Sequence, residues 1–266
     1  MNKAQREFEE RIWAFYHDHG RDLLWRHDPT PYGVFISEVM LQQTQVARVS
    51  VKYSIWLARF PDFASLAAAS VAEVVEAWQG MGYNRRALWL QRAARSIISD
   101  YGGVLPRSAS ELVKLPGIGP NTAGSIAAFA YDLPTVFIET NIRRVFIHEF
   151  FKDRTEVEDR EIMPLVEATI DPEHPREWYY ALMDYGANLA KEVVNPNRRS
   201  RHYVRQSVFE GSLRQIRGEV LRQLLAGPKA QNELRVTDVR LAMVLEQLLK
   251  EGFINRSGTR FALIGK

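Results

Sequence analysis

The sequence contains no cysteine among its 266 residues. A chain without thiols forms no disulfide, and it holds neither a thiolate zinc site nor a cysteine-ligated iron–sulfur cluster. It also lacks any apolar run long enough to cross a membrane, and its N-terminal residues are charged and follow a helical pattern. We therefore expect neither a transmembrane segment nor a signal peptide, and we expect the protein in the cytoplasm.

The net charge is small as well. The formal value is +3, and 46% of the residues are hydrophobic, which suffices for one large or two modest cores. Basic residues nevertheless gather locally, at Arg85 and Arg86 and again at Arg198, Arg199 and Arg201. Such clusters suit a phosphate backbone, but a solvated basic surface explains any one cluster equally well.

The most informative stretch predicts two helices joined by a tight turn, within residues 111–130. Residues 111–114 close a short helix, Gly117 and Gly119 are both free to adopt positive φ, and Pro120 opens a second helix that ends near residue 130. This pattern predicts a helix-hairpin-helix, whose outward N–H groups suit a phosphate without reading a base sequence. A Gly-x-Gly turn also occurs in ordinary αα-corners, so the turn alone does not decide between these readings.

Other motifs decide more. Trp25-Arg26 is followed by Ser-Glu-Val-Met-Leu-Gln-Gln-Thr-Gln-Val at residues 37–46, then by Gly-Met-Gly-Tyr at residues 80–83 and Leu-Met-Asp-Tyr-Gly-Ala at residues 182–187. With the hairpin, this series resembles the helix-hairpin-helix DNA glycosylases, and the mismatch-specific adenine glycosylases more than the endonuclease III branch. The resemblance covers roughly residues 20 to 190.

The resemblance implies an all-α fold with a six-helix barrel and a second helical domain. The barrel is expected in residues 24–134, and the second domain in residues 1–23 plus 135–211. Residues 212–266 have the pattern of three helices and a β-hairpin turning at Ser257-Gly258, which predicts a small winged-helix-like domain. Such a domain either places a helix in the major groove or serves as a packing or protein-contact module.

Helical periodicity and breakers set the remaining expectations. A polar loop is expected around residues 26–31, and the helix expected after it would place Glu38, Gln42 and Gln45 on one stripe. Helices are expected over residues 3–20, 32–48, 53–60, 65–78, 86–101, 216–225, 229–235 and 239–251.

Two carboxylates are the candidate catalytic residues. From its position alone Glu38 is an ordinary surface group of an amphipathic helix, but the resemblance makes it the acid that protonates a departing purine, which requires a raised pKa. Glu139 occupies the place of an aspartate that stabilises the sugar cation in relatives. Its extra methylene leaves three explanations: a pocket rebuilt around glutamate, another base as substrate, or a DNA binder with little activity. Thr140 is expected to cap the following helix, since glutamate is a poorer cap than aspartate.

The resemblance also assigns contacts to the base and to the duplex. Gln43 and Tyr83 match positions that wedge into the duplex beside an extruded base, although Tyr83 also reads as a core or surface aromatic beside Gly82. The expected base-pocket residues are Trp25, Arg26, Asn121 and Asn141. The expected DNA contacts are Gln42, Gln43, Tyr83, Gly117, Gly119, Thr122, Arg198, Arg199 and Arg201.

Two further differences from relatives bear on chemistry. Asn121 stands where bifunctional relatives carry a lysine that forms a Schiff base, so no strand cleavage by that route is expected. The four cysteines that follow the residue 182–187 motif in most relatives are missing, so no iron–sulfur cluster is expected, and a monovalent cation at the hairpin is the one candidate cofactor. The basic loop 198–205 either contacts DNA or connects to the next domain.

Together these features predict a monofunctional base-excision glycosylase that acts on duplex DNA with a mismatch or lesion, as a monomer associated with the nucleoid. Adenine opposite 8-oxoguanine or guanine is the first expected substrate. The alternatives are thymine or uracil opposite guanine, a damaged base, or a non-catalytic protein that binds mismatches or abasic sites. No C-terminal domain of the kind that reads 8-oxoguanine in relatives is recognisable, which leaves specificity for that lesion open.

Overall fold

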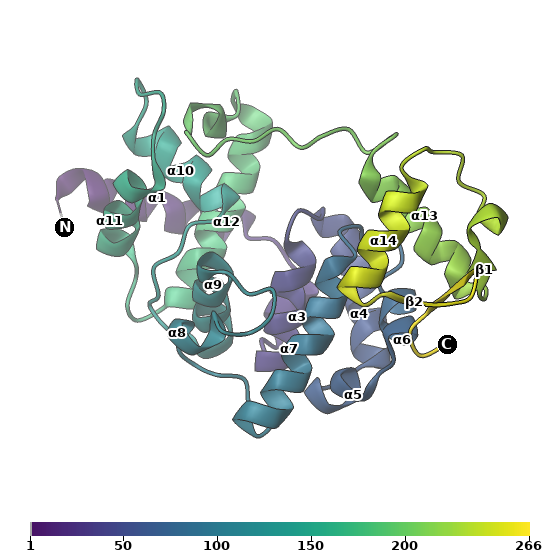
Figure 1. Ribbon diagram of the computed structural model, residues 1–266. Coiled ribbons are helices and arrows are strands. Elements are labelled where there is room, and N and C mark those ends of the chain that lie inside the picture. The colour runs from purple at the N-terminus through teal and green to yellow at the C-terminus, as the bar shows by residue number, and fades with distance from the viewer. Residues whose placement is uncertain (1) are drawn as a thin grey trace. The chain divides into compact units, whose positions relative to one another are not determined.

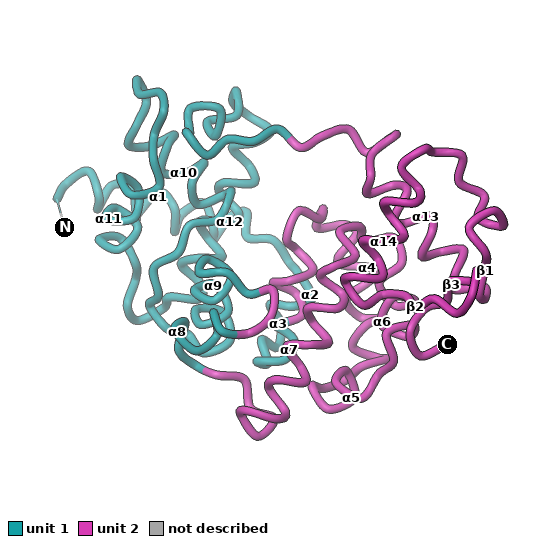
Figure 2. Tube along the Cα trace, in the orientation of Figure 1, with its two compact units in different colours: residues 1–35, 107–114, 118–205 teal, residues 36–106, 115–117, 206–266 magenta. Residues whose placement is uncertain are grey.

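The computed structural model describes residues 2–266, which form two compact units coloured separately in Figure 2. Among the described residues, unit 1 comprises residues 2–35, 107–114 and 118–205, and unit 2 comprises residues 36–106, 115–117 and 206–266. Residues 206–266 therefore share a unit with residues 36–106. The three-part division expected from the resemblance, with boundaries after residues 23, 134 and 211, stays a prediction.

Unit 1 is entirely helical apart from its loops (Figure 1). Helices α1 and α10 both pack against α12, and the rings of Phe8, Phe146 and Trp178 meet between them, with centroids 5.3 Å apart for Phe8 and Phe146. Its elements are α1 (Lys3–His19), α2 (Leu24–His27), the first half of α3 (Pro31–Leu41), α8 (Ala109–Leu112), α9 (Pro120–Tyr131), α10 (Thr140–Phe150), α11 (Asp159–Thr169), α12 (Pro175–Glu192) and the 3-10 turn η1 (Pro196–Arg199).

Unit 2 joins a helical part to a small three-stranded sheet with the antiparallel order β1-β3-β2. One hydrophobic core runs through both parts, because Val75 and Leu88 are buried together with Val220, Leu245 and Phe253. Its elements are the second half of α3, α4 (Val46–Arg59), α5 (Phe63–Ala68), α6 (Val71–Ala77), α7 (Arg85–Tyr101), α13 (Leu213–Leu225), β1 (Lys229–Ala230), η2 (Gln231–Glu233), α14 (Leu241–Glu251), β2 (Ile254–Ser257) and β3 (Arg260–Leu263).

The mostly helical fold is confirmed, and several expected helices are broken. The helix predicted over residues 32–48 is wrong, because α3 ends at Leu41 and α4 begins at Val46. The helix predicted over 65–78 is two helices, since Ser70 caps the start of α6. The helix predicted over 229–235 is also wrong: it consists of β1 and one 3-10 turn. The hairpin turning at residues 257–258 is confirmed, whereas the winged-helix assignment stays a prediction.

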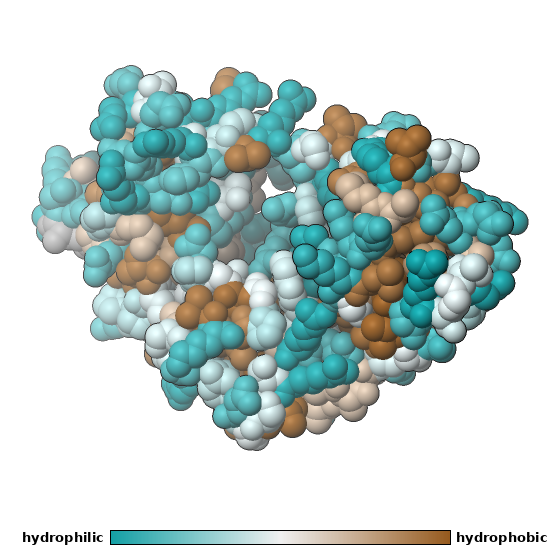
Figure 3. Space-filling model, in the orientation of Figure 1, coloured by the Kyte–Doolittle hydropathy of each residue, from teal (hydrophilic) through white to brown (hydrophobic). Residues whose placement is uncertain are grey.

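No helix among residues 2–266 is both long enough and apolar enough to cross a membrane. On the face shown in Figure 3, hydrophobic residues occur in patches among hydrophilic ones.

Candidate active site

Glu38 lies near the C-terminal end of α3, a helix whose other side chains are mostly buried. Val34, Phe35, Val39 and Met40 are all less than 4% exposed, whereas Glu38 is partly exposed. The helix is therefore fixed by its packing on both sides of the carboxylate. This is the environment that a positioned acid requires, with restricted motion and limited access to water.

The chain leaves the helix immediately after this turn. Gln43 has φ +54°, and Gln45 is the extended residue that precedes α4. The stripe expected for Glu38, Gln42 and Gln45 is therefore wrong, because only Glu38 belongs to α3. Gln43 is exposed on the connecting loop, in a left-handed conformation that residues other than glycine adopt rarely.

A single buried guanidinium, that of Arg86, holds this loop. Its Nη1 donates to the carbonyls of Val39, Met40 and Gln42 at 2.8, 2.9 and 2.6 Å. Its Nη2 donates to Thr44 Oγ1 at 2.9 Å. It also donates to two carbonyls of the loop between α6 and α7, those of Met81 and Gly82, at 3.3 and 3.2 Å. Arg86 thus satisfies the last carbonyls of α3 and fastens two loops to each other.

Sequence reasoning placed Arg86 in a basic surface cluster, which is wrong. The residue is 3% exposed, and burial lowers its pKa to about 10, so the side chain still carries its charge near neutral pH. A signal for this was present in the sequence. Arg86 lies on the same face of α7 as Leu90, Ala93 and Ile97, which are all buried.

The second of these loops carries Tyr83, whose φ is +46°. Its hydroxyl oxygen accepts hydrogen bonds from Arg214 Nη1 at 2.6 Å and from Gln206 Nε2, and the Arg214 guanidinium lies 5.0 Å from the ring centroid. Both residues expected to wedge into a duplex therefore occupy left-handed backbone on loops joined by Arg86. Such conformations concentrate at functional sites, which supports the prediction for Gln43 and Tyr83 without testing it.

The hairpin between α8 and α9 uses its two glycines differently. Gly117 has φ +80°, and a Cβ there would lie 2.7 Å from Trp89 Cβ. Gly119 has φ −87° and ψ 171°, so of the two glycines only Gly117 uses the positive φ open to glycine. It is instead the residue before α9, and a Cβ built on it meets nothing within 4 Å. The exposed backbone at this helix start is free of covering side chains, as a phosphate site requires.

Two other predicted residues lie in the first turn of α9. Asn121 is exposed, and its Oδ1 accepts a hydrogen bond from the N–H of Ile138 at 3.2 Å. Thr122, beside it, is partly exposed. Asn121 therefore connects α9 to the segment that leads into Glu139.

Glu139 caps α10 with its own side chain. Oε1 accepts the backbone N–H groups of Asn141 at 2.6 Å and Ile142 at 2.9 Å, and Oε2 accepts Asn141 Nδ2 at 3.2 Å. The expectation that Thr140 takes this role is wrong. The extra methylene of glutamate is accommodated because the carboxylate folds back over the helix start, where the dipole also favours an anion.

The surroundings of Glu139 affect its charge. The residue is partly exposed, yet its carboxyl group is enclosed by protein atoms, and this burial raises the pKa of Glu139. The N–H groups of Ile142 and Asn141 and the charges of Arg144 and Arg143 oppose that shift. The carboxyl group is thus poorly hydrated and held by three donors. When ionised, a group in such an arrangement is suited to stabilising a positive charge next to it.

The motif at residues 182–187 supports the start of α10. Arg144 Nη1 donates to Asn141 Oδ1 and to the Gly186 carbonyl, each at 2.7 Å. A Cβ on Gly186 would lie 2.6 Å from the Asn141 carbonyl oxygen, so only glycine fits there. Asn141, expected in the base pocket, therefore orients Glu139 and packs against this motif.

Asp184 of the same motif is buried and bonded to two arginines. Arg26 donates to its two oxygens at 2.8 and 2.7 Å, and Arg21 donates through Nε at 2.6 Å. Burial raises the pKa of Asp184, but these hydrogen bonds and charges outweigh it and hold the pKa below its usual value. Arg26 also lies 4.3 Å from the Tyr180 ring centroid, and Trp25 is 5% exposed. Trp25 and Arg26, two of the four residues expected in the base pocket, contribute to the packing of unit 1.

The profile of the HhH-GPD superfamily of base excision DNA repair proteins matches residues 36–168. The chain belongs to this superfamily. It is 37% identical over 194 residues to the adenine DNA glycosylase of Mus musculus, which covers 68% of this chain and 38% of that protein. It is 32% identical over 276 residues to the adenine DNA glycosylase of Mycolicibacterium smegmatis, covering 94% of each.

The chain thus spans 38% of the length of the mouse relative and nearly all of the mycobacterial one. Among solved structures, a thermostable thymine-DNA glycosylase aligns with a TM-score of 0.64 and 26% identity, over 70% of this chain and 87% of that one. An endonuclease III–DNA complex aligns with a TM-score of 0.58 and 21% identity, over 69% and 85% of the two chains, which shows a shared fold.

The iron–sulfur cluster of many HhH-GPD proteins does not fit this chain, which has no cysteine to ligate it. In its place, η1 is tied to α10 by hydrogen bonds. Asn197 Nδ2 donates to the Thr140 carbonyl at 3.0 Å, and the Arg199 guanidinium donates to the carbonyls of Phe151 at 2.6 Å and Ile147 at 3.2 Å, and to that of Lys152. Polar side chains therefore fasten the loop that a cluster organises in relatives.

The three arginines expected to contact DNA differ in their hydrogen-bond partners. Arg199 is hydrogen-bonded to the C-terminal end of α10, and Arg201 pairs with Glu158. The DNA contacts expected for these two residues stay predictions. Arg198 is exposed and remains a candidate DNA contact of this loop. Among residues 2–266 there is no group of three or more histidines, aspartates and glutamates that could hold a metal ion. The monovalent cation expected at the hairpin stays a prediction.

Proposed function

We propose that the protein is a monofunctional DNA glycosylase that hydrolyses the N-glycosidic bond of adenine mispaired with guanine or 8-oxoguanine. The observation that carries the proposal is the carboxylate of Glu139, fixed at the start of α10 by three hydrogen bonds in a poorly hydrated site. Membership of the HhH-GPD superfamily and the adenine glycosylases among the relatives support the same activity.

In the proposed reaction the two carboxylates act in opposite protonation states. Glu38, held on the packed end of α3, gives its proton to a ring nitrogen of the adenine, which makes the base a neutral leaving group. Glu139 stays ionised and stabilises the positive charge that develops on the sugar as the bond breaks. Water then adds to the sugar carbon and loses a proton, so the products are free adenine and an abasic site.

No Schiff base is expected in this reaction. Asn121 occupies the position of the lysine in bifunctional relatives, and its side-chain oxygen already accepts the N–H of Ile138. We therefore expect an intact strand after base release. Borohydride treatment of the reaction should trap no covalent protein–DNA adduct, and an adduct formed in high yield would refute the monofunctional assignment.

The test is base release under single-turnover conditions from five duplexes that differ in one pair: adenine opposite 8-oxoguanine, adenine opposite guanine, thymine opposite guanine, uracil opposite guanine, and hypoxanthine opposite thymine. Alkali reveals the abasic sites. We expect fast release from the two adenine mispairs. A protein that binds these duplexes and releases none of the bases would be the non-catalytic alternative, and the proposal would be abandoned.

The variant Glu38→Gln assigns the acid. A positioned acid contributes about 10²- to 10⁴-fold to rate, so adenine release should fall by that factor while the duplex Kd stays within about twofold. Glu246→Gln, an exposed glutamate on α14, is the matched control and should change neither quantity. If Glu38→Gln retains full rate, another group protonates the base.

Thymine or uracil opposite guanine is the second candidate substrate. The likeness to the thermostable thymine-DNA glycosylase, at 26% identity, favours it. The same five duplexes decide between the two, because fast release of a pyrimidine with slow release of adenine would replace the first proposal.

A further inference from the structure

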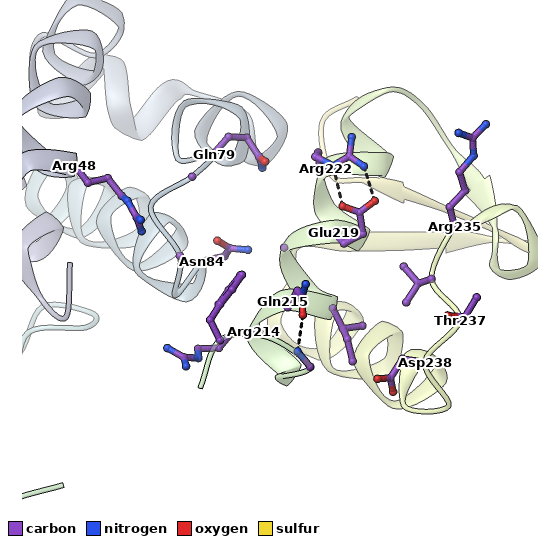
Figure 4. A pocket seen from close by; sticks show the side chains of 17 residues that line it. Arg48, Gln79, Asn84, Arg214, Gln215, Glu219, Arg222, Arg235, Thr237 and Asp238 are labelled. Atoms are coloured by element: carbon purple, nitrogen blue, oxygen red, sulfur yellow. Dashed lines mark hydrogen bonds and ion pairs between the residues drawn. The ribbon is translucent and has the colours of Figure 1, made fainter. Parts of the chain in front are cut away.

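Unit 2 contains a cleft of about 650 Å³ that the proposed reaction does not use. Figure 4 shows Arg48, Gln79 and Asn84 on one side of it, and α13 with Arg222, Arg235 and Thr237 on the other. The first side belongs to α4 and to the loop that carries Tyr83, and the second to the C-terminal part of the chain. The cleft is therefore continuous with the loop expected to enter the duplex.

The lining of the cleft is basic. Four arginines contribute to it: Arg48, Arg214, Arg222 and Arg235. Arg48 and Arg235 are exposed, and among the described residues neither guanidinium has a hydrogen bond or an ion pair with another residue. Two cations that no internal carboxylate neutralises are available to an anion from outside the chain.

The two carboxylates in the lining are already paired. Glu219 accepts from Arg222 at 2.5 and 2.9 Å, and Asp238 accepts from Arg240 at 2.6 and 2.8 Å. These hydrogen bonds hold the pKa of Asp238 at about 2, so it remains an anion bound to its own arginine. Neither carboxylate is free to neutralise Arg48 or Arg235.

The backbone of the cleft is unusually bare. Gly218 lies in the interior of α13, where glycine is less favourable than alanine, and a Cβ built on it meets nothing within 4 Å. Nothing in the described chain therefore requires glycine at this position. Gly82 and Gly211 also line the cleft, again with open space at a Cβ, and Phe209 beside them is 56% exposed. Bare backbone next to unpaired cations suits a ligand that approaches closely and carries negative charge.

We infer that this cleft binds the sugar–phosphate backbone of the DNA substrate, with phosphates at Arg48 and Arg235 and a sugar passing over Gly218. The inference rests on the proposed function, since it extends the footprint of the same duplex beyond the hairpin and the Tyr83 loop. Arg214 links the two regions, because it lines the cleft and donates to the Tyr83 hydroxyl. Phosphates fit better than an acidic peptide, because two exposed guanidinium groups beside open backbone offer positive charge but little that would recognise a side chain.

Two variants of the full-length protein test the inference. The double variant Arg48→Ala/Arg235→Ala removes both unpaired cations, and Arg6→Ala/Lys250→Ala removes two exposed cations outside the cleft as a control of equal charge. The Kd is measured for a 30-base-pair duplex with a central abasic-site analogue over a range of salt concentrations. Each lost phosphate contact should reduce the slope of log Kd against log salt by about 0.9.

We expect the cleft variant to lose about 1.8 of this slope and to bind at least tenfold more weakly at low salt, with the control unchanged. Gly218→Ala is the second test. It should raise Tm by a few degrees, since alanine favours the helix and meets no neighbour, and yet weaken duplex binding severalfold. A loss of affinity in a variant that is more stable has no explanation in misfolding.

The inference and the proposed function fail in different ways. If the wild-type protein neither binds the duplex nor releases a base, the proposed function is wrong. If it does both and the cleft variant keeps the wild-type slope, the inference is overturned. Competition with poly-glutamate supplies a third outcome. The inference is also overturned if poly-glutamate displaces the duplex from the wild type but not from the cleft variant, at a concentration where a phosphorylated oligonucleotide displaces none. The cleft would then be assigned to an acidic peptide.

Discussion

The start of α10 and the end of α3 fix their functional side chains in opposite ways. At the start of α10 several residues share the work: Glu139, Asn141, Arg144 and Gly186 each bond or pack against another. At the end of α3 one residue does nearly all of it, because Arg86 alone donates to six oxygens, two in α3 and four on two loops. At the start of α10 the contacts that hold the functional side chain come from several residues, whereas at the end of α3 they come from one.

This difference predicts where the protein is vulnerable. A shared arrangement tolerates the loss of one partner, since the others keep the geometry. An arrangement built on one buried cation fails with that cation, because its partners are left as unsatisfied buried carbonyls. Substitutions at the two sites should therefore differ in size and in kind, with stability lost at α3 and rate lost at α10.

The largest effect is expected for Arg86→Met, which keeps the length of the side chain and removes every donor. We expect the free energy of unfolding to fall by about 4 kcal/mol, because five carbonyls and the Thr44 hydroxyl lose a charged donor at once. Urea denaturation followed by circular dichroism measures it. The neighbouring Arg85→Met breaks an exposed ion pair with Glu251 and should cost less than about 1 kcal/mol. Equal losses in the two variants would show that Arg86 is not the central support.

Glu139→Gln should lose rate rather than stability. Glutamine keeps an oxygen for the N–H groups of Asn141 and Ile142 but removes the charge, so base release should slow by about 10²- to 10³-fold. Because burial raises the pKa of Glu139, the neutral form already suits the fold, and the free energy of unfolding should change by less than about 1 kcal/mol. A stability loss larger than this would mean that the anion holds the fold together.

The pH dependence of rate gives a second measure of Glu139. The reacting form is the anion, so the rate should fall as the pH drops through a pKa raised above 4.5, the ordinary value for glutamate. Single-turnover rates between pH 4 and 9 should show this acidic limb in the wild type. In Glu139→Gln the limb should be absent, because the group that titrates is gone. A limb of unchanged position in the variant would assign it to another residue.

The sequence predicted the fold better than it predicted the contacts that hold the candidate site residues in place. Breakers and periodicity place the boundaries of α1 and α9 correctly, because a strong stop or a proline marks each end. The end of α3 is hidden in the sequence, since no glycine or proline stands at residues 42–44, and the residue that binds this loop, Arg86, lies far along the chain. The residues near the end of α3 do not reveal that their carbonyl groups bind an arginine more than forty residues later in the chain.

The same limit applies to charged residues near the candidate site. Sequence reasoning placed Arg26 in the base pocket, Arg86 in a surface cluster and Arg199 among the DNA contacts, because a lone arginine carries no mark of its partner. In the structure each is bonded internally, to Asp184 or to main-chain carbonyls. Their role depends on where distant oxygens come to lie, and this only the folded chain specifies.

The next largest effect is expected at η1, where substitutions of two adjacent arginines should change different quantities, one the stability and the other the affinity for DNA. Arg199→Ala removes hydrogen bonds to carbonyls at the end of α10 and should lower the free energy of unfolding by about 2 kcal/mol, with duplex affinity unchanged. Arg198→Ala should do the reverse, leaving stability within about 0.5 kcal/mol and weakening duplex binding. Thermal unfolding and fluorescence anisotropy measure the two quantities. The prediction fails if Arg199→Ala weakens binding at full stability.

The smallest effect is expected at Thr140, where it decides which residue caps α10. The Glu139 carboxylate accepts the N–H groups of Asn141 and Ile142, which leaves Thr140 as an exposed first residue of the helix with no donor to satisfy. Thr140→Ala should therefore change the free energy of unfolding by less than about 0.5 kcal/mol, since alanine is also the better helix former. Ser70→Ala is the reference, because Ser70 accepts the N–H of Glu73 at 3.2 Å and its loss should cost about 1 kcal/mol. If Thr140→Ala costs as much as Ser70→Ala, threonine caps the helix, and Glu139 is free to move toward the sugar instead of being fixed at the helix start.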